Sequence, residues 1–441
     1  MLGTFANMFR IPELRKKILI TLGILVVYRI GCNLPVPGVN VDALQEFFKH
    51  QKGGIADLFG MVTMLSGGAL RQATVFALGI MPYISATIIF QLLTGVIPAL
   101  EKLRKEGESG LKKIRQYERY TTVLLCLIQG IMLVRWMSGE VTPITQRRVF
   151  VGGGLTQVTA LVTMTTGTML LMWLGDQITQ SGIGNGISLI IMAGIVARLP
   201  IAIWDMMMKK TDPGTVLFLI VAFVVIISGV VLITQGQRRI PVQQAKHTRG
   251  RRVYGGQRQY LPFRVNHAGV MPVIFASTLL IFPKMITKAL TKYGGFWEAL
   301  HERAFLGDTW IYVLLYILLI YFFAYFWTSL QFKPKDLSEN LQDYGSFIPG
   351  IRPGRRTAAY LENVMTHITL AGATFLAAVA ILPQVLRMSM GIGWATAGFY
   401  GGTGLLIVVG VALDLVEKIE SHLMMRHYEG FMRKGRIRGR R

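Results

Sequence analysis

Charged side chains are scarce in this sequence, and acidic ones are the scarcest. Asp, Glu, Lys and Arg together make up 16% of the 441 residues, against roughly 25% in soluble domains. Only 23 residues are acidic against 47 that are basic, and 52% are apolar. So little charge could not cover a soluble protein with so large an apolar fraction, whereas a bilayer accommodates it. The composition excludes an ordinary soluble domain and predicts an integral membrane protein.

Motifs for catalysis, nucleotide binding and metal binding are also absent. There is no GxxxxGK phosphate-binding loop and no CxxC pair, and His301-Glu302 has no second histidine to complete an HExxH motif. The two cysteines, Cys32 and Cys126, fall in apolar segments and are interpreted as small core residues, not as a disulfide. We therefore expect no enzyme activity, no cofactor, no metal site and no hydrolysis of ATP by the chain itself.

Ionisable residues are nearly absent from the middle of the apolar segments. Arg29, Asp176, Arg198 and Asp414 lie near segment ends, where a charge is less costly. Proton- and ion-coupled transporters usually keep buried ionisable groups for their coupling. This lack argues against a secondary transporter of small solutes, which remains the alternative function.

Ten segments are long and apolar enough to suggest membrane spans. A spanning helix needs about 20 mostly apolar residues, and its backbone groups must be hydrogen-bonded within the segment, which favours helix. We expect the first span to be permanent, because no clear cleavage site follows it. The predicted spans are 18–35, 72–98, 120–136, 155–175, 186–204, 214–234, 268–287, 309–330, 364–386 and 396–416.

Basic residues indicate which side of the membrane each loop faces. The N-terminal segment, the loops 101–119, 235–267 and 331–361, and the tail from 417 hold 32 of the 47 Lys and Arg residues. The positive-inside rule places this richer side in the cytoplasm. An even number of spans then puts both termini there, and ten spans divide into two halves of opposite topology.

Segment 53–70 is apolar in its middle but too short to cross the membrane. Glycine pairs flank it and permit hinge conformations. A stretch of this length is more often re-entrant or interfacial than spanning. It is either a movable element that dips into a pore or a loop that lies on the outer leaflet.

Two isoleucine pairs recur at a spacing of four residues. Ile80 with Ile84, and Ile187 with Ile191, each share one face of a predicted helix. Such pairs are by themselves typical of ordinary core or lipid-facing positions. Neighbouring Gly, Ser and Thr residues favour packing against other helices over packing against lipid.

Two loops on the basic side are long and contain turn signals. Loop 235–267 has eight basic residues and no acidic one, and its stretch 251–260 predicts a hairpin that turns at Gly255-Gly256. Loop 331–361 contains Pro and Gly residues that give turns of fixed geometry. The two loops suggest a docking platform for an acidic protein or for RNA. The alternative is that they only determine topology.

Several longer stretches, in order along the chain, resemble the SecY family, the pore subunits of the bacterial protein-translocation channel. The resemblance runs from about Pro12 to Glu429. Its most specific stretches are ALGIMPYISA at 77–86, GESG at 107–110, GIGNGIS at 182–188, GQRRI at 236–240, FIPGIRPG at 347–354 and GGT at 401–403.

The resemblance implies an all-α polytopic membrane protein, with ten transmembrane helices in two inverted five-helix halves around a central pore. It divides the chain into a cytoplasmic segment 1–17, an N-terminal half 18–204, a C-terminal half 205–416 and a basic cytoplasmic tail 417–441. Six side chains would form the waist of the pore: Ile80, Ile84, Ile187, Ile191, Ile274 and Ile407. Segment 55–66 would be a plug, with Ile55, Leu58, Phe59, Met61, Met64 and Leu65 as its apolar residues.

The resemblance also implies a lateral gate and a set of partners. The gate would lie between spans 2, 3, 7 and 8, with Gln91, Thr121 and Asn266 as polar latch residues. The partners would be the SecE and SecG membrane subunits, the SecA motor or a translating ribosome, unfolded preproteins and the lipid bilayer. The residues that dock the motor or ribosome would be Arg238, Arg239, Arg251, Arg252, Arg352, Arg355 and Arg356.

The implied function is a channel in the bacterial cytoplasmic membrane. It would pass unfolded secretory proteins across the membrane and release membrane segments sideways into it, driven by an external motor because the chain has no nucleotide site. An isoleucine waist suits this task, since its contacts are non-directional and fit a passing chain of any sequence. An intramembrane enzyme has no catalytic constellation in the sequence to support it.

Overall fold

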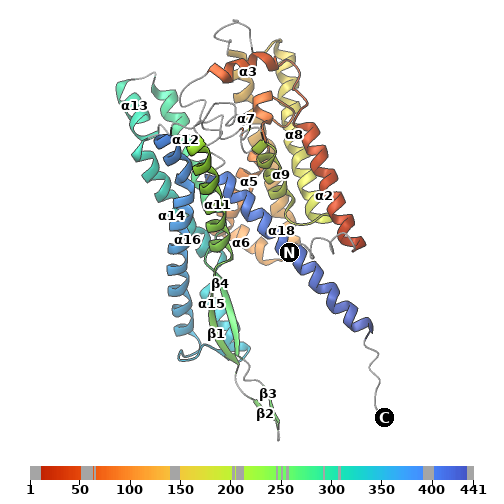
Figure 1. Ribbon diagram of the computed structural model, residues 1–441, viewed down its shortest axis with the longest axis vertical. Coiled ribbons are helices and arrows are strands. Elements are labelled where there is room, and N and C mark those ends of the chain that lie inside the picture. Colours follow the sequence, from red (N-terminus) through yellow and green to blue (C-terminus); the bar gives the residue numbers. More distant parts are fainter. Residues whose placement is uncertain are drawn as a thin grey trace. The chain divides into compact units, whose positions relative to one another are not determined.

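The computed structural model describes residues 11–50, 63, 66–139, 149–200, 204, 213–244, 247–249, 252–254, 258–291, 294–305, 309–390 and 402–434. Its contacts divide the chain into two compact units (Figure 1). The first comprises Met1–Lys210 with Val411–Arg441, and the second comprises Thr211–Gly410. Helices dominate both units, in agreement with the predicted all-α class.

Most helices of the first unit pack against helices close to them in the sequence, and α2 packs against the more distant α8. Helix α5 contacts α7, α7 contacts α8, and α8 contacts both α2 and α9. An ion pair of 2.7 Å between Arg119 and Asp176 also joins α7 to α8. The elements are α2 (Pro12–Gly31), α3 (Val41–His50), η1 (Ala69–Gln72), α5 (Met81–Val96), α6 (Pro98–Lys105), α7 (Glu108–Gly139), α8 (Gly154–Ser181) and α9 (Gly186–Val196).

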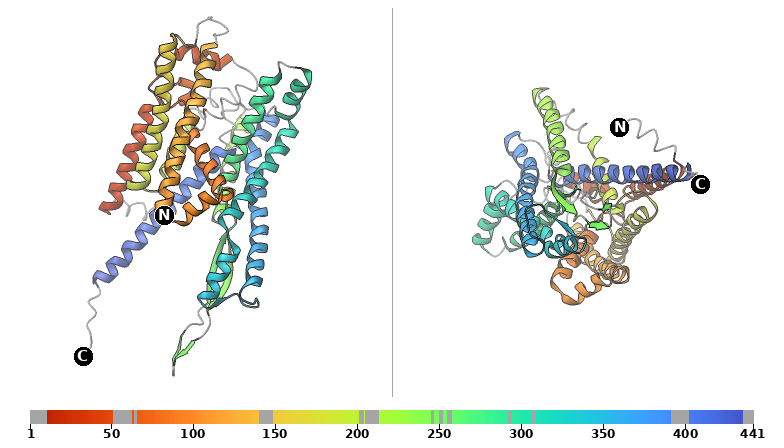
Figure 2. Two further views of the ribbon diagram at one scale, coloured as in Figure 1. Left: turned by 180° about the vertical axis from the view of Figure 1, so that it is seen from behind. Right: turned by 90° about the horizontal axis from the view of Figure 1, so that it is seen from below.

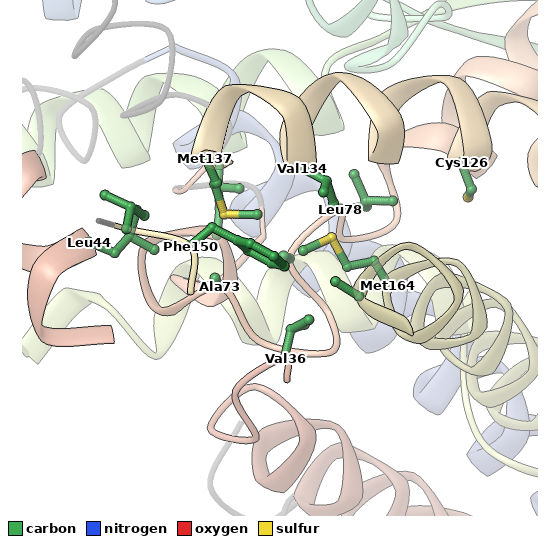
Figure 3. Packing of buried hydrophobic residues seen from close by; sticks show 13 residues of the cluster. Val36, Leu44, Ala73, Leu78, Cys126, Val134, Met137, Phe150 and Met164 are labelled. Atoms are coloured by element: carbon green, nitrogen blue, oxygen red, sulfur yellow. The ribbon is translucent and has the colours of Figure 1, made fainter. Parts of the chain in front are cut away.

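An apolar cluster holds α7 and α8 to the non-helical segments around them (Figure 3). Phe150 lies between Met137 and Val134 of α7 and Met164 of α8. Cys126 belongs to the same cluster and is fully buried. Both cysteines are buried and free, which confirms the prediction that they are core residues.

Glycines mark the closest approaches between elements of this unit. A Cβ on Gly167 of α8 would lie only 2.0 Å from the carbonyl oxygen of Val75, and one on Gly186 would lie 2.0 Å from the carbonyl oxygen of Gly175. No larger residue fits either contact without a backbone shift. These positions agree with the expectation that small residues let membrane helices approach closely.

The last helix, α18 (Gly402–Lys434), contributes its C-terminal part to the first unit. Ile419 packs against Leu14 of α2 and against Ile183 in the turn between α8 and α9. This contact ties the last long helix to the first one described.

The second unit packs three long helices side by side and adds a small sheet. Helix α14 lies between α12 and α16 (Figure 2). Phe275 of α12 contacts the rings of Phe323 and Trp327 on α14. The elements are α11 (Pro213–Gln235), β1 (Gln237–Gln244), β2 (His247–Arg249), β3 (Arg252–Tyr254), β4 (Arg258–Arg264), α12 (Met271–Leu290), α13 (Gly295–Leu300), η3 (His301–Phe305), α14 (Trp310–Gln331), α15 (Pro334–Asp343), β5 (Ser346–Phe347) and α16 (Arg355–Met390).

Each of the ten predicted spans contains a helix, but the structure does not make each one a full-length apolar helix. Among the described residues, five helices are long and apolar enough to cross a membrane by themselves, and a bent pair, α5 with α6, makes a sixth. Helix α9 and the first half of α12 are apolar but shorter. The count of ten spans therefore stays a prediction.

The second predicted span, 72–98, differs most from the structure. Residues 75–80 form turns, and the helix begins only at Met81. Pro82 suits a helix start, because its fixed φ is already helical and its missing N–H would be unpaired there anyway. At the other end Ile97 is extended before Pro98, and the chain bends by 99° into α6.

The hairpin in the first basic loop turns at a different place from the one predicted. Strand β1 pairs antiparallel with β4, from Gln237 opposite Arg264 to Gln243 opposite Arg258. Strand β2 pairs with β3 in the same register, ending at Arg249 opposite Arg252 (Figure 1). The register of both ladders is centred between Arg249 and Arg252 and not at Gly255-Gly256, which lie outside the described residues. The prediction was wrong because the long-range ladder overrides the local turn signal.

Candidate functional site

Ile80 and Ile84 lie one helical turn apart, as the sequence predicts. Ile80 is the N-cap residue of α5, and its carbonyl accepts a hydrogen bond of 3.1 Å from the N–H of Ile84. Ile80 is buried, with 4% of its surface exposed, and Ile84 is half-buried. The two side chains therefore share one face at the start of a short helix.

The turn before Ile80 is held by polar contacts that sequence reasoning missed. Gly79 has a positive φ of 60°, which favours glycine. Its carbonyl accepts a hydrogen bond of 3.1 Å from the buried hydroxyl of Thr168 on α8. A Cβ on Gly79 would lie 3.2 Å from the Cβ of Ser66, the last residue of the predicted plug segment. These contacts fix where α5 starts, and so where Ile80 lies.

Ile187 and Ile191 lie on α9, whose start is set by a side-chain cap. The side-chain oxygen Oδ1 of Asn185 accepts hydrogen bonds from the backbone N–H groups of Ile187 and Ser188, at 3.2 and 3.5 Å. An Asn in this position satisfies N–H groups that the helix itself leaves unpaired. Ile187 packs against α8 at Gly175, where a Cβ would lie 3.0 Å from its Cγ1. Ile191 is buried, with 7% exposed.

The other two predicted waist residues belong to the second unit. Ile274 lies in the first turn of α12 with 9% of its surface exposed, and Ile407 lies in α18 with 3% exposed. Five of the six isoleucines thus lie on helices and Ile80 caps one, and their convergence on one pore stays a prediction.

The six apolar plug residues lie outside the described residues. They are Ile55, Leu58, Phe59, Met61, Met64 and Leu65. The residues that follow them are held by close glycine contacts. A Cβ on Gly67 would lie 2.8 Å both from the Cα of Gly194 on α9 and from the hydroxyl oxygen of Tyr28 on α2. The glycine pairs in 53–70 predicted hinge conformations and not this contact, and no local signal pointed to Gly194 or Tyr28.

The predicted gate residues lie on three elements. Gln91 is on α5 and Thr121 on α7, both half-buried in the first unit, and half-buried Asn266 precedes α12 in the second. The buried side-chain oxygen of Gln91 has no hydrogen-bond partner among the described residues. A buried polar atom without a partner is costly, by about 1–3 kcal/mol. Gln91 is therefore the gate residue with an unmet hydrogen-bonding capacity.

The two basic loops fold together into one structure, which we call the platform: β1, β4, β5, α15 and the first two turns of α16. Strand β5 of the second loop pairs with β1 of the first, with Phe347 opposite Gln243 and Ser346 opposite Gln244. A cluster of buried apolar residues joins both loops and α16: Ile240, Val242, Phe263, Ile348, Leu361, Val364, Met365 and Ile368. The platform thus has its own apolar core.

The predicted docking arginines lie on the outside of this platform where the structure describes them. Arg238 and Arg239 on β1, and Arg352, Arg355 and Arg356 around the start of α16, are all exposed. Arg252 is the first residue of β3, and Arg251 lies outside the described residues. Burial and the charge of Arg264 lower the pKa of nearby His267, so this imidazole is neutral at pH 7 and adds no charge.

Hydrogen bonds fix the backbone around Arg352. The hydroxyl of Thr357 donates to the Arg352 carbonyl at 3.0 Å, and that of Ser338 on α15 donates to the Gly354 carbonyl at 2.8 Å. Gly350 and Gly354 have φ values of 86° and 97°, which favour glycine. The exposed Arg352 side chain therefore projects from a backbone of set geometry.

Two units of helices and a separately cored basic platform define a polytopic membrane protein, and comparison with known proteins shows its family. The SecY family profile matches residues 74–416. "Protein translocase subunit SecY" of Streptomyces galbus is 46% identical over 98% of this chain and 100% of that protein, and its namesake in Thermotoga maritima is 42% identical over 99% of both. The chain therefore belongs to the SecY family.

Solved structures share the fold at low sequence identity. "The structure of a protein conducting channel" gives a TM-score of 0.60 at 18% identity, over 94% of this chain and 96% of that chain. "Sec61 in the Canine ribosome-channel complex from the endoplasmic reticulum" gives 0.58 at 17%, with the same coverage. Family and fold together confirm the predicted class, a protein-conducting channel, over a secondary transporter of small solutes.

We predict that the platform depends on its apolar core. Ile240 is 2% exposed and lies opposite Leu261 in the β1–β4 ladder. Ile240→Ala should lower the local stability by roughly 2–5 kcal/mol, so the β1 and β4 amides should exchange hydrogen at least about thirtyfold faster. Arg239→Ala, at the exposed neighbouring position, is the matched control. Equal exchange in the two variants, measured on purified protein, would contradict this account of the platform.

Proposed function

We propose that this chain is the central subunit of a channel that passes unfolded secretory proteins across the cytoplasmic membrane of a bacterium. The supporting observation is identity of 42–47% to protein translocase subunits over nearly the whole chain. The chain acts as a conduit and not as an enzyme. Its termini both lie in the cytoplasm, according to the distribution of its Lys and Arg residues.

In this proposal the six isoleucines form the waist of the pore. Apolar contacts have no preferred direction, so one ring can fit around a passing chain of any sequence. An apolar constriction also excludes hydrated ions by dewetting. The polar contacts at Gly79 and Asn185 support this role, because they fix the starts of the two short helices that carry four of the six residues.

The plug and the lateral gate complete the channel in this proposal. Segment 55–66 closes the outer funnel, and the residue that follows it, Gly67, packs closely against Gly194 of α9. The gate opens between the two halves, so that an apolar segment of a client partitions into lipid when lipid is the more favourable environment. The unpaired oxygen of Gln91 favours a polar latch, because a partner across the closed gate would remove its desolvation cost.

The platform is the proposed dock for the SecA motor or a translating ribosome, and SecE and SecG are the proposed membrane partners. The chain has no nucleotide-binding motif, so the driving force must come from outside it. Arg355 and Arg356 occupy the first turn of α16, which has no acidic residue. Positive charge is unfavourable at a helix N-terminus, and an acidic or phosphate partner would compensate it.

We predict that the resting channel leaks ions when a polar residue interrupts the apolar surface of the waist. Ile84→Ser should raise the ion conductance of the resting channel, because a hydroxyl lets water wet the constriction. The matched control is Ile89→Ser on the same helix, since Ile89 is 38% exposed and is not a waist position. Planar-bilayer recordings measure the resting conductance of both variants, which should rise only for Ile84→Ser. A resting conductance that is the same for the two variants would be evidence against the waist.

We predict that Arg352 contributes more to motor-driven transport than the neighbouring arginines of the platform do. Arg352→Glu should reduce motor-driven transport of a preprotein into vesicles by on the order of tenfold, because it reverses an exposed charge that projects from a backbone of set geometry. Its cost to folding should stay within about 0.5 kcal/mol, as for other exposed changes. Arg352→Lys should be partly impaired, since it lacks the planar fork of arginine.

The control is Arg356→Glu, also exposed and four residues away. It should do milder harm, because its side chain lies outside the turn that fixes Arg352. Equal and mild losses in the two variants would mean that the loop contributes only its net charge.

A further inference from the structure

Three arginines meet at a cavity in the first unit, outside the waist and the platform. Arg29 comes from the last turn of α2, Arg71 from η1, and Arg198 from just beyond the end of α9. The cavity has a volume of about 340 Å³, which is within the range of small-ligand sites. Among the described residues its wall also contains the amide side chains of Asn33, Gln45 and Gln72, and no carboxylate.

The backbone of the Gly67-Gly68 turn holds two of these guanidinium groups in place. The Nη1 of Arg29 donates a long hydrogen bond of 3.5 Å to the Gly67 carbonyl. A Cβ on Gly68 would lie 2.9 Å from the Nε of Arg198, so the turn lies directly against that guanidinium. Gly68 also has a φ of 96°, which favours glycine. The arrangement is therefore set by the fold.

The three positive charges have no acidic partner in the part of the chain that the structure describes. No ion pair there involves Arg29, Arg71 or Arg198, and both Arg29 and Arg71 act electrostatically on Arg198. Like charges held this close repel one another, at a cost that an anion between them would remove. Amide N–H groups in the same wall add neutral donors.

We propose that this cavity binds a phosphate group, either as free phosphate or as the headgroup of an anionic phospholipid. Arginine presents a planar fork of N–H donors that matches phosphate oxygens. Three forks from three elements suit a tetrahedral group with several oxygens better than a planar carboxylate with two. Arg29 and Arg198 lie near the ends of predicted spans, where lipid headgroups are also found. The proposal does not rest on the translocation activity.

The test uses the full chain purified in neutral detergent with whatever subunits accompany it. Its thermal unfolding is followed as inorganic phosphate replaces chloride at constant ionic strength, and native mass spectrometry then counts retained phosphatidylglycerol against phosphatidylcholine. Saturable stabilisation by phosphate identifies the free ion as a ligand. Selective retention of phosphatidylglycerol without a phosphate effect identifies the lipid headgroup.

Substitutions assign either effect to the cavity. Arg71→Gln and Arg198→Gln should each weaken binding by about tenfold, as expected for the loss of one charge-assisted contact. Arg135→Gln, which changes an exposed arginine on α7 outside the cavity, is the control and should leave binding unchanged. Arg71 is exposed on a short turn, so Arg71→Gln should fold. This variant therefore tests binding at the cavity even if Arg198→Gln does not fold. No saturable effect of either ligand, or equal binding by Arg71→Gln and Arg135→Gln, would overturn the proposal.

Discussion

The structure depends on one constraint: inside a bilayer every backbone N–H and C=O must find its partner within the protein. Helices meet this demand within each segment, and each predicted span contains one. In the described part of the chain, strands occur only between 237 and 264 and at 346–347, outside those spans. The non-helical turns at 75–80 obey the same rule, since the N–H groups of Val75, Ala77 and Gly79 all donate to backbone carbonyls and the Gly79 carbonyl accepts from Thr168.

The same constraint separates two kinds of contact within the first unit. Directional contacts lie at helix starts, where Asn185 caps α9 and Thr168 holds the turn before α5. The side chains that these helices present as the proposed waist are apolar and make no directional contact. A channel for unrelated client proteins needs both kinds of contact. Hydrogen bonds fix the positions of its helices, whereas an apolar lining does not select among the sequences that pass. The platform, which lies outside the predicted spans, also separates its contacts: apolar residues form its core, and the arginines are exposed on its surface.

Hydropathy predicted where the helices are, because burial in lipid and helix formation follow from the same local composition. Hydropathy failed where contacts with distant segments determine the ends of an element or its register. The start of α5 at Met81 depends on Thr168 from α8, and the hairpin tip depends on a register that begins at Gln237. The pairing of β1 with β5 joins residues about a hundred positions apart, and no local sequence pattern predicts this pairing. The isoleucine positions came from family resemblance, since their spacing alone fits any apolar helix.

The most direct test of the central claim is site-specific photo-cross-linking to a preprotein arrested during transport. A photoreactive residue at each of Ile84, Ile191, Ile274 and Ile407 should cross-link to the arrested chain, because in the proposed waist all four side chains surround it. The same residue at Ile89, which is 38% exposed on α5, should cross-link to lipid instead. Cross-links to the preprotein at Ile89 as strong as those at Ile84, or none at Ile274 and Ile407, would contradict a single waist built from both units.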